Sequence, residues 1–478
     1  MLKRVRIALT ALLLLAAVGV NAQVTTASMA GKVTDASNEP IIGATVQAVH
    51  QPSGSRYGTV TNVDGRYSIQ GMRTGGPYRV EISYIGYQTV IYKDITLQLG
   101  EVYNLNVEMS ESSELLNEVI VTAAKTKFTA EKTGATTNIS SAQITQLPTV
   151  NRSISDIARL SPYANGMSFA GGDGRSTNFT IDGANFNNNF GLSSNLPGGG
   201  NPISMDAIEE VQVVVAPFDV RQTNFIGGGI NAITKSGTNT FRGTAYTYYR
   251  NQDMRGNRIN GEDLGARSDE SKTTYGFTLG GPIIKNKLFF FVNYEKEKTP
   301  GEVIKYRARE DGEEAKGMVS RTLKSDMEKV YNHLKDKYGY DAGSYTSFPA
   351  DEENTKILAR IDWNITDRHR LSLRYNNTKN TAWNAPNGNS SDTGYRLNNT
   401  YRVGTQSMAF ANSMYSMDNK VQSWATDLNS RFTDKISNQL LFTYTNIEDM
   451  RGTNSSPFPF IDIMAGKDEN GTRFWNRT

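Results

Sequence analysis

Few side chains in this sequence have the types and spacing that bond-making chemistry requires. The 478 residues include no cysteine, which excludes thiolate nucleophiles and cysteine metal ligands. The three histidines, His50, His333 and His369, lie far apart and lack the spacing of metal ligands. We find no nucleophile–base arrangement, no paired acids and no HExxH motif. The sequence therefore predicts a protein that is not an enzyme and that has no catalytic residues, cofactor or metal.

Two further motifs have chemical interpretations that we do not favour. Asp35 and Asp64 could suggest calcium, but Asp64-Gly65 has the form of a tight hairpin turn, in which such carboxylates are common. Gly227–Gly229 is not followed by a GxxxxGK[ST] pattern, so a phosphate-binding loop is not supported. We interpret both aspartates as turn residues.

Two segments have the composition of binding sites instead. Residues 185–200 are rich in asparagine and glycine, and their amides and aromatic rings could contact a ligand. The candidate contacts are Asn185, Phe186, Asn187, Asn188 and Phe190. A structural loop that fills an interior is the alternative. The second segment is a short β-prone run inside a polar connector, residues 110–127, and such a run can add to the sheet edge of a partner. It consists of Glu118, Val119, Ile120, Val121 and Thr122, and packing on the edge of the preceding domain is the alternative.

Composition and the N-terminus limit the class of protein. Hydrophobic residues make up only 37%, with 43 glycines and a formal net charge of +3 without a basic patch, which favours β-structure and disfavours nucleic-acid binding. Lys3, Arg4 and Arg6 precede the apolar run Ile7–Val20, so residues 1–22 are predicted to be a signal peptide. An uncleaved anchor is the alternative, although the run is shorter than the ~18 residues that a membrane helix needs.

The elements that must position the binding segments fall into three regions. Residues 23–109 contain short alternating runs separated by turn residues, which predicts a β-sandwich. The expected strands are Ala30–Thr34, Ile42–Val49, Arg56–Thr61, Tyr67–Gln70, Tyr78–Tyr84 and Val102–Met109. Residues 128–240 predict a small α+β domain. Its expected helices lie at Arg152–Leu160 and Ser204–Glu210, and its expected strands at Phe179–Ile181, Val211–Val215 and Ile230–Thr234.

Residues 241–478 contain seven strand candidates of about 9–11 residues, the length that crosses a membrane as a tilted strand. They are Phe241–Arg250, Thr273–Gly281, Leu288–Lys298, Thr355–Thr366, Arg370–Lys379, Val421–Thr433 and Asn438–Glu448. Apolar and polar residues alternate along them, and short connections alternate with long polar ones, which is typical of an outer-membrane β-barrel. A charged helix is expected at Glu313–Lys337. Seven strands do not close a bacterial barrel, so we expect this chain to be the N-terminal part of a longer protein.

The amino-acid sequences of several segments resemble those of a known protein family. IDGANF, IEEVQVVVAPFDVR and GGGINAITKSGTN resemble the plug domain of TonB-dependent outer-membrane receptors, with the Oar-like branch as the nearest. GKVTDASNEPIIGATV, TNVDGRYSI and YRVEISYIGYQT resemble the carboxypeptidase-regulatory-like domain that precedes the plug in Bacteroidetes-type receptors. The resemblance implies a mostly β protein with an N-terminal sandwich, a plug at 128–240 and the first strands of a transmembrane antiparallel barrel at 241–478. It also places Gly227–Gly229 close to the barrel wall.

The resemblance further implies energised uptake of a peptide or other large nutrient across the outer membrane. Glu118–Thr122 would be the TonB box, held by TonB with ExbB–ExbD, and residues 185–190 would face the ligand. The barrel would contact outer-membrane lipid, and the N-terminal domains would lie in the periplasm. The sequence does not decide whether a surface lipoprotein covers the barrel as a lid, as in glycan importers. Siderophores and cobalamin are alternative ligands. The alternative from another class is an adhesion or surface-organisation protein without energised uptake.

Overall fold

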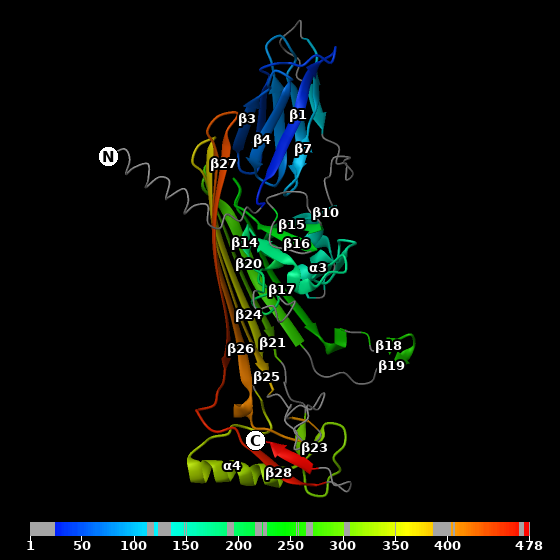
Figure 1. Cartoon of the computed structure of the whole chain (residues 1–478), viewed down its shortest axis with the longest axis vertical. Helices are drawn as coiled ribbons and strands as arrows, with labels where there is room; N and C mark the ends of the chain where they lie inside the picture. The colour runs from blue at the N-terminus through cyan, green and yellow to red at the C-terminus, as the bar shows by residue number, and fades with distance from the viewer. Residues whose placement is uncertain are drawn as a thin grey trace, which may run out of the picture.

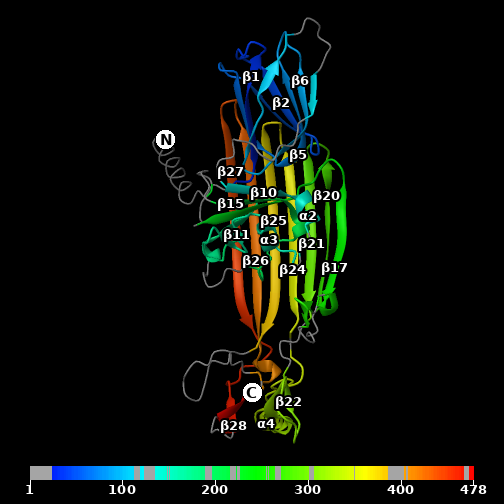
Figure 2. The same ribbon diagram turned by 90° about the vertical axis from the view of Figure 1, so that its right-hand side faces the viewer.

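The computed structural model describes residues 24–111, 119–122, 135–147, 149, 151–188, 196–215, 222, 227–254, 256, 258–263, 271–300, 306–348, 350–385, 403–404, 407–467 and 473–477. The predicted signal peptide, Glu118 and Phe190 lie outside these residues. The described chain forms a β-sandwich at one end of a long curved sheet, an α+β plug region against the inner face of that sheet, and a layer of loops at the other end (Figures 1 and 2).

The N-terminal sandwich consists of two sheets with a shared core. One sheet pairs β4 (Arg66–Met72), β1 (Ala27–Asp35), β7 (Val102–Asn104) and β8 (Val107–Met109). The other has the order β3 (Ser55–Val60), β2 (Thr45–His50), β5 (Gly75–Ser83), β6 (Val90–Leu97) and β9 (Val119–Thr122). Alternate residues point inward, as Tyr78, Val80 and Ile82 of β5 show, and all three are fully buried. Strand β6 is the one that the sequence prediction missed.

The plug region is a five-stranded mixed sheet with short helices on it. Its order is β10 (Ala135–Ser140), β15 (Ile208–Val215), β16 (Gly228–Thr234), β13 (Asn178–Ile181) and β14 (Ala184–Asn185). The helices are α2 (Ser141–Gln146) and α3 (Ile154–Ala158). The helix expected at Ser204–Glu210 is only a 3-10 turn, Met205–Ala207, because the β-branched and apolar run from Ile208 continues as strand β15.

Glycines allow close approaches both within the plug region and between the plug region and the barrel wall. At Gly228 a Cβ would lie 2.6 Å from the ring of Phe169, which belongs to the plug region itself. The expectation that Gly227–Gly229 approaches the barrel wall was therefore wrong for the described contacts. Gly237 has that position instead, because its Cβ would lie 2.4 Å from the Phe290 carbonyl oxygen and 2.7 Å from that of Gly281.

The barrel sheet contains all seven predicted strands, antiparallel and in chain order. They are β17 (Arg242–Asn251), β20 (Ser271–Ile284), β21 (Leu288–Thr299), β24 (Glu352–Asn364), β25 (His369–Asn384), β26 (Tyr415–Arg431) and β27 (Ser437–Gly452). On β24, Ile357, Ile361 and Trp363 are about two-fifths exposed, whereas Lys356 and Asp362 are buried. The apolar face therefore points outward and the polar face toward the plug region, as the alternation predicted.

The connections between these strands differ at the two ends of the sheet. Tight turns at 285–287, 365–368 and 432–436 lie at the sandwich end, whereas the long connections lie at the opposite end (Figure 1). The predicted charged helix is shorter than expected, α4 (Lys324–Tyr338), since residues 319–323 form strand β23, which pairs with β22 (Arg307–Arg309).

The long connections pack on one another. Met327 and Leu334 of α4 are buried against Met408, Phe410 and other residues of the connection between β25 and β26. Helix α4 thus has a packed face, which its charged sequence does not indicate. Among the described residues, no helix combines the length and the apolar character that a membrane crossing requires.

Gly31 offers a test of the sandwich packing. A Cβ at Gly31 would lie 1.9 Å from the Leu105 carbonyl oxygen, on the backbone that leads from β7 to β8. We predict that Gly31→Ala lowers the free energy of unfolding by about 1–3 kcal/mol, because the backbone must move apart. Gly58→Ala on β3 is the matched control, since its nearest atom would be 3.6 Å away. Thermal unfolding of the purified chain measures both, and equal midpoints would contradict this packing.

Candidate functional site

The predicted TonB-box run forms an edge strand of the sandwich. Strand β9 (Val119–Thr122) pairs in parallel with β6, with Val119 aligned to Val90 and Thr122 to Lys93. The alternative left open by the sequence, packing on the edge of the first domain, describes this backbone arrangement. Whether TonB holds this run is not tested by the arrangement and stays a prediction.

The predicted ligand-contact residues form a hydrogen-bonded turn next to β13. The Asn187 side chain accepts a hydrogen bond from the Phe179 N–H at 2.6 Å and donates one to Asn178 at 2.9 Å. Asn185 accepts from the Asn187 N–H at 2.7 Å. Phe186 is 1% exposed and packs edge-to-face on Phe179, with ring centroids 6.2 Å apart. In this conformation these side chains support the plug core, and their contact with a ligand stays a prediction, as it does for Asn188.

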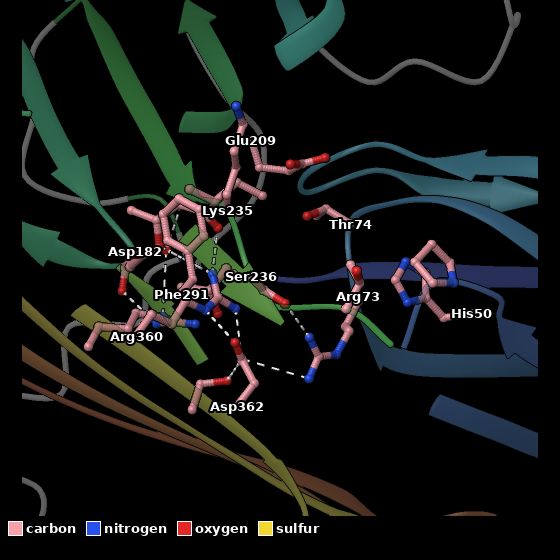
Figure 3. A pocket seen from close by; sticks show the side chains of 18 of the residues that line it. His50, Arg73, Thr74, Asp182, Glu209, Lys235, Ser236, Phe291, Arg360 and Asp362 are labelled. Carbon is pink, nitrogen blue, oxygen red and sulfur yellow. Dashed lines mark hydrogen bonds and ion pairs between the residues drawn. The ribbon is translucent and has the colours of Figure 1, made fainter. Parts of the chain in front are cut away.

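A buried ionic cluster joins the plug region to the barrel sheet. Asp362 on β24 accepts two hydrogen bonds from Arg360, at 2.8 and 2.9 Å, and both side chains are almost fully buried. Arg360 also donates to the Thr234 carbonyl of the plug region at 2.6 Å and lies 3.8 Å from Asp182. Asp182 in turn accepts from the Thr234 N–H and hydroxyl, and Arg374 lies 3.6 Å from it. Figure 3 shows Asp182, Arg360 and Asp362 pointing toward one another.

A second buried cluster lies farther along the lumenal face. Lys356, which is 1% exposed, donates to Glu295 at 2.8 Å and to Glu297. Ser204 of the plug region and Tyr246 of β17 both donate to Glu295 at 2.9 Å. The barrel sheet is thus tied to the plug region here through hydrogen bonds to an ionised group, which are stronger than bonds between neutral partners.

The sandwich contacts the same ionic cluster from the other side. Arg73 donates to Ser236 of the plug region at 2.8 Å and lies 3.7 Å from Asp362. Thr25 donates to Asp427 of β26 at 2.7 Å, and the Arg370 guanidinium lies 3.7 Å from the centre of the Tyr57 ring. The sandwich is therefore held across the end of the barrel sheet that carries the tight turns.

A cavity of about 720 Å³ lies where the three parts meet. Figure 3 shows that residues of the sandwich, plug region and barrel sheet line it, among them Arg73, Lys235 and Arg360. Among the described residues, no group of three or more histidine, aspartate or glutamate side chains is arranged to hold a metal ion. Its wall combines ion-paired side chains such as Arg360 with apolar side chains such as Ile233 and Phe291.

One backbone position joins the sandwich directly to the plug sheet. The Leu99 N–H donates to Glu210 at 3.0 Å, and the Leu99 carbonyl accepts from Gln212 at 2.6 Å and from Asn138 at 3.1 Å. Asn138 also donates to Glu210 at 3.0 Å. Burial raises the pKa of the Glu210 carboxyl to about 8, against the hydrogen bonds from Leu99 and Asn138 that favour its ionised form.

Sequence reasoning missed the residues that connect these parts. The alternation along the strand candidate Thr355–Thr366 puts Lys356, Arg360 and Asp362 on its polar face, but it does not identify their partners. The available signal was the charge itself, because a charged residue on the inner face of a barrel needs a partner or water. Arg73, Asp182 and Glu210 carried no signal of this kind, since their roles depend on contacts between distant segments.

Two domain families match parts of this chain. Residues 28–110 match the family described as Carboxypeptidase regulatory-like domain. Residues 233–304 match the family described as Outer membrane beta barrel domain. These ranges correspond to the sandwich and to the entry of the chain into the barrel sheet. They confirm the predicted resemblance to a regulatory-like domain and to an outer-membrane barrel.

A curated relative extends the similarity across the plug region. The TonB-dependent transporter Oar of Myxococcus xanthus is 25% identical over 376 residues, which are 73% of this chain and 33% of the relative. This chain therefore spans about a third of that protein. The match confirms the predicted Oar-like resemblance, and with the barrel family it confirms an outer-membrane location.

Solved structures of outer-membrane proteins also overlap with this chain in part. The transporter YddB of Escherichia coli has a TM-score of 0.48 and 16% identity, over 72% of this chain and 43% of that one. The siderophore receptor PirA of Pseudomonas aeruginosa has a TM-score of 0.41 and 15% identity, over 67% of this chain and 42% of that one.

The ionic cluster predicts a large effect from one carboxylate. We expect Asp362→Asn to destabilise the attachment of the plug region by about 3–5 kcal/mol, because it leaves Arg360 and Arg73 buried without a full counter-charge. Glu353→Gln on the same strand is the control, since Glu353 pairs with Lys296 and Lys298 at an exposed site where such pairs contribute ~0–1 kcal/mol. Proteolysis of the plug region over a urea series measures both. Equal urea dependence of the two variants would contradict the role of Asp362.

Glu210 predicts a pH dependence of the contact between sandwich and plug region. Its folded pKa of about 8 exceeds the ordinary value of 4.5, so the stabilisation is complete below about pH 4.5 and is lost as pH rises through 8. Hydrogen exchange of β10 and β15, corrected for the intrinsic rate, should therefore be faster at pH 8.5 than at pH 6. Glu210→Gln should remove this difference, whereas Glu108→Gln, at an exposed sandwich position, should retain it. A pH dependence that survives in Glu210→Gln would assign it to another group.

Proposed function

We propose that this protein takes part in TonB-dependent uptake of a ligand across the outer membrane. The observation that supports the proposal most directly is the polar attachment of the plug region inside the barrel sheet. A plug that only sealed a pore would be held best by apolar packing. Here Arg360 and Arg374 lie within ion-pair distance of Asp182, and Glu295 accepts a hydrogen bond from Ser204. Water can replace such contacts during a movement.

The position of the predicted TonB box also supports uptake, which is transport toward the periplasm. Val119–Thr122 lies on the sandwich, at the end of the barrel sheet that carries the tight turns, which in outer-membrane barrels is the periplasmic end. Twelve residues separate Thr122 from Ala135, the first residue of plug strand β10. A partner that pulls on the box would therefore load the edge strand of the plug sheet. TonB, with the proton-motive ExbB–ExbD complex, is the partner that we assign.

The ligand would enter from the opposite end, through the packed loops that include α4. A peptide or another large nutrient is the class that we assign, in line with the Oar-like similarity of this chain. Outer-membrane lipid would contact the exposed apolar face of strands such as β24, on which Trp363 is 40% exposed. Co-purification of a surface lipoprotein with this protein would identify such a lid.

Proline in the TonB box tests the proposal. We expect Val119→Pro and Val121→Pro in the native outer-membrane protein to reduce uptake at least tenfold and to leave ligand binding intact. Proline removes a backbone donor that a strand-addition partner requires. Val119→Ala and Val121→Ala are the matched controls and should keep most of the uptake.

The readout is uptake of labelled peptides by whole cells with and without an uncoupler. Loss of both uptake and binding in the proline variants would contradict the TonB-box assignment. Cell-surface attachment that is insensitive to the uncoupler, without uptake, would favour the adhesion alternative.

A further inference from the structure

The edge of strand β6 is the feature of the sandwich that needs a partner. Without β9, β6 would be the last strand of its sheet, and it begins with the apolar run Val90-Ile91-Tyr92. An edge strand of this kind presents unpaired N–H and C=O groups and is a template for another strand. Strand β9 covers it in a parallel register that aligns Val90 with Val119 and Tyr92 with Val121. The same short run is thus the predicted TonB box and the cover of the sandwich edge.

Two contacts bring the start of the connector to this edge. The Gln88 N–H donates to the Ser110 carbonyl at 2.9 Å, and Tyr87 forms an isolated antiparallel bridge with Glu111. Tyr87 and Gln88 precede Val90, the residue that is aligned with Val119, by three and two positions, so the start of the connector lies next to the docking edge. Only seven residues lie between Glu111 and Val119. A short tether of this kind gives a high effective concentration, on the order of millimolar, and a small loop-closure cost.

The pairing between β6 and β9 is short enough to be reversible. It spans four aligned residues, and each backbone hydrogen bond contributes only about 0.5–1.5 kcal/mol net against the entropy of ordering the strand. A partner that offers a longer strand edge can therefore displace β6. The other edge of β9 has no strand paired to it among the residues that the structure describes.

The docked strand also changes where a pull would act. While β9 is paired with β6, a force on Val119–Thr122 is carried by the sandwich, which Arg73 and Thr25 hold to Asp362 and Asp427 of the barrel sheet. The load then bypasses β10. After β9 leaves β6, the load passes through residues 123–134 to Ala135, at the start of the plug edge strand. Detachment from β6 is thus the step that directs force to the plug region.

We propose that the β6 edge of the sandwich is a docking site for the chain's own TonB-box strand, β9. We further propose that β6 and TonB compete for binding to β9. The inference rests on the proposed function for the identity of the competitor, although the docking itself does not. As a consequence, the regulatory-like domain determines how readily TonB can bind β9. While β9 is paired with β6, TonB does not pull on the plug region.

A disulfide lock tests the competition, and the absence of native cysteines makes it clean. Tyr92→Cys with Val121→Cys places two thiols at aligned positions, where Cα atoms of neighbouring strands are ~5 Å apart and a disulfide can form. Lys93→Cys with Val119→Cys is the matched control. Its positions are three residues out of register, about 10 Å apart along the strand, which is too far for a disulfide. Both pairs are introduced into the native protein in outer membranes.

The expected result is a disulfide in the aligned pair after mild oxidation, found by mass spectrometry, with little in the control pair. Purified TonB periplasmic domain should bind the oxidised aligned variant at least tenfold more weakly than the same variant after reduction. Equal cross-linking in the two pairs would overturn the docking. A disulfide in the aligned pair without a change in TonB binding would overturn the competition.

The same assay separates these failures from failure of the proposed function. If TonB binds neither the unmodified protein nor the reduced variant, the proposed function is overturned and the competition with it. If TonB binds both of these and binds the oxidised form equally well, the proposed function stands and the further inference alone is overturned.

Discussion

The structure depends on the requirement that charged groups on the inner face of the barrel sheet find partners. An antiparallel sheet that turns its apolar face to lipid turns its polar face inward, and buried charges without a counter-charge are costly. Asp362 is the centre of this requirement. Arg360 from the same strand binds it, Arg360 also reaches Thr234 and Asp182 of the plug region, and Arg73 approaches it from the sandwich. One carboxylate thus orders three parts of the chain that are far apart in sequence.

The polar character of these contacts fits the movement of the plug region that the proposed function requires. Hydrogen-bonded ion pairs are specific in geometry, but replacing them by water costs far less than exposing an apolar core of the same area. The plug region keeps its own apolar core around Phe179 and Phe186, and only a few barrel residues, such as Phe291 and Leu358, join it. Stability within the plug region and attachment of the plug region therefore rest on different interactions. This separation permits movement of the plug without unfolding of the barrel.

The sequence was most informative where structure is local and periodic. Barrel strands such as β24 could be predicted because a two-residue alternation sustained over 13 residues fits a strand and does not fit the 3.6-residue period of a helix. Strand β6 was missed because Lys93 and Asp94 interrupt its alternation, and Asp94 adopts a φ of 63°. The docking of the sandwich could not be predicted at all. It joins Ser55 to Asn364 and Thr25 to Asp427 across more than 300 residues, and in the sequence these polar side chains do not differ from ordinary surface residues.

The order of the plug strands decides which one a pull from the connector would reach first. Among the described residues, strand β10 is the edge strand of the plug sheet and pairs only with β15, and Ile139 is its one fully buried apolar residue. In contrast, every residue of β16 is buried, and the strand pairs on both sides. Asn138 of β10 also bonds both the Leu99 carbonyl and Glu210, so loss of β10 removes part of the attachment of the sandwich and opens the buried carboxyl to water. In water the pKa of the Glu210 carboxyl returns toward its ordinary value of 4.5, so its ionisation opposes re-formation of the contact increasingly as pH rises above 4.5. The edge strand and the Leu99 contact therefore act as one unit, in which displacement of the strand weakens the hold of the sandwich on the plug region.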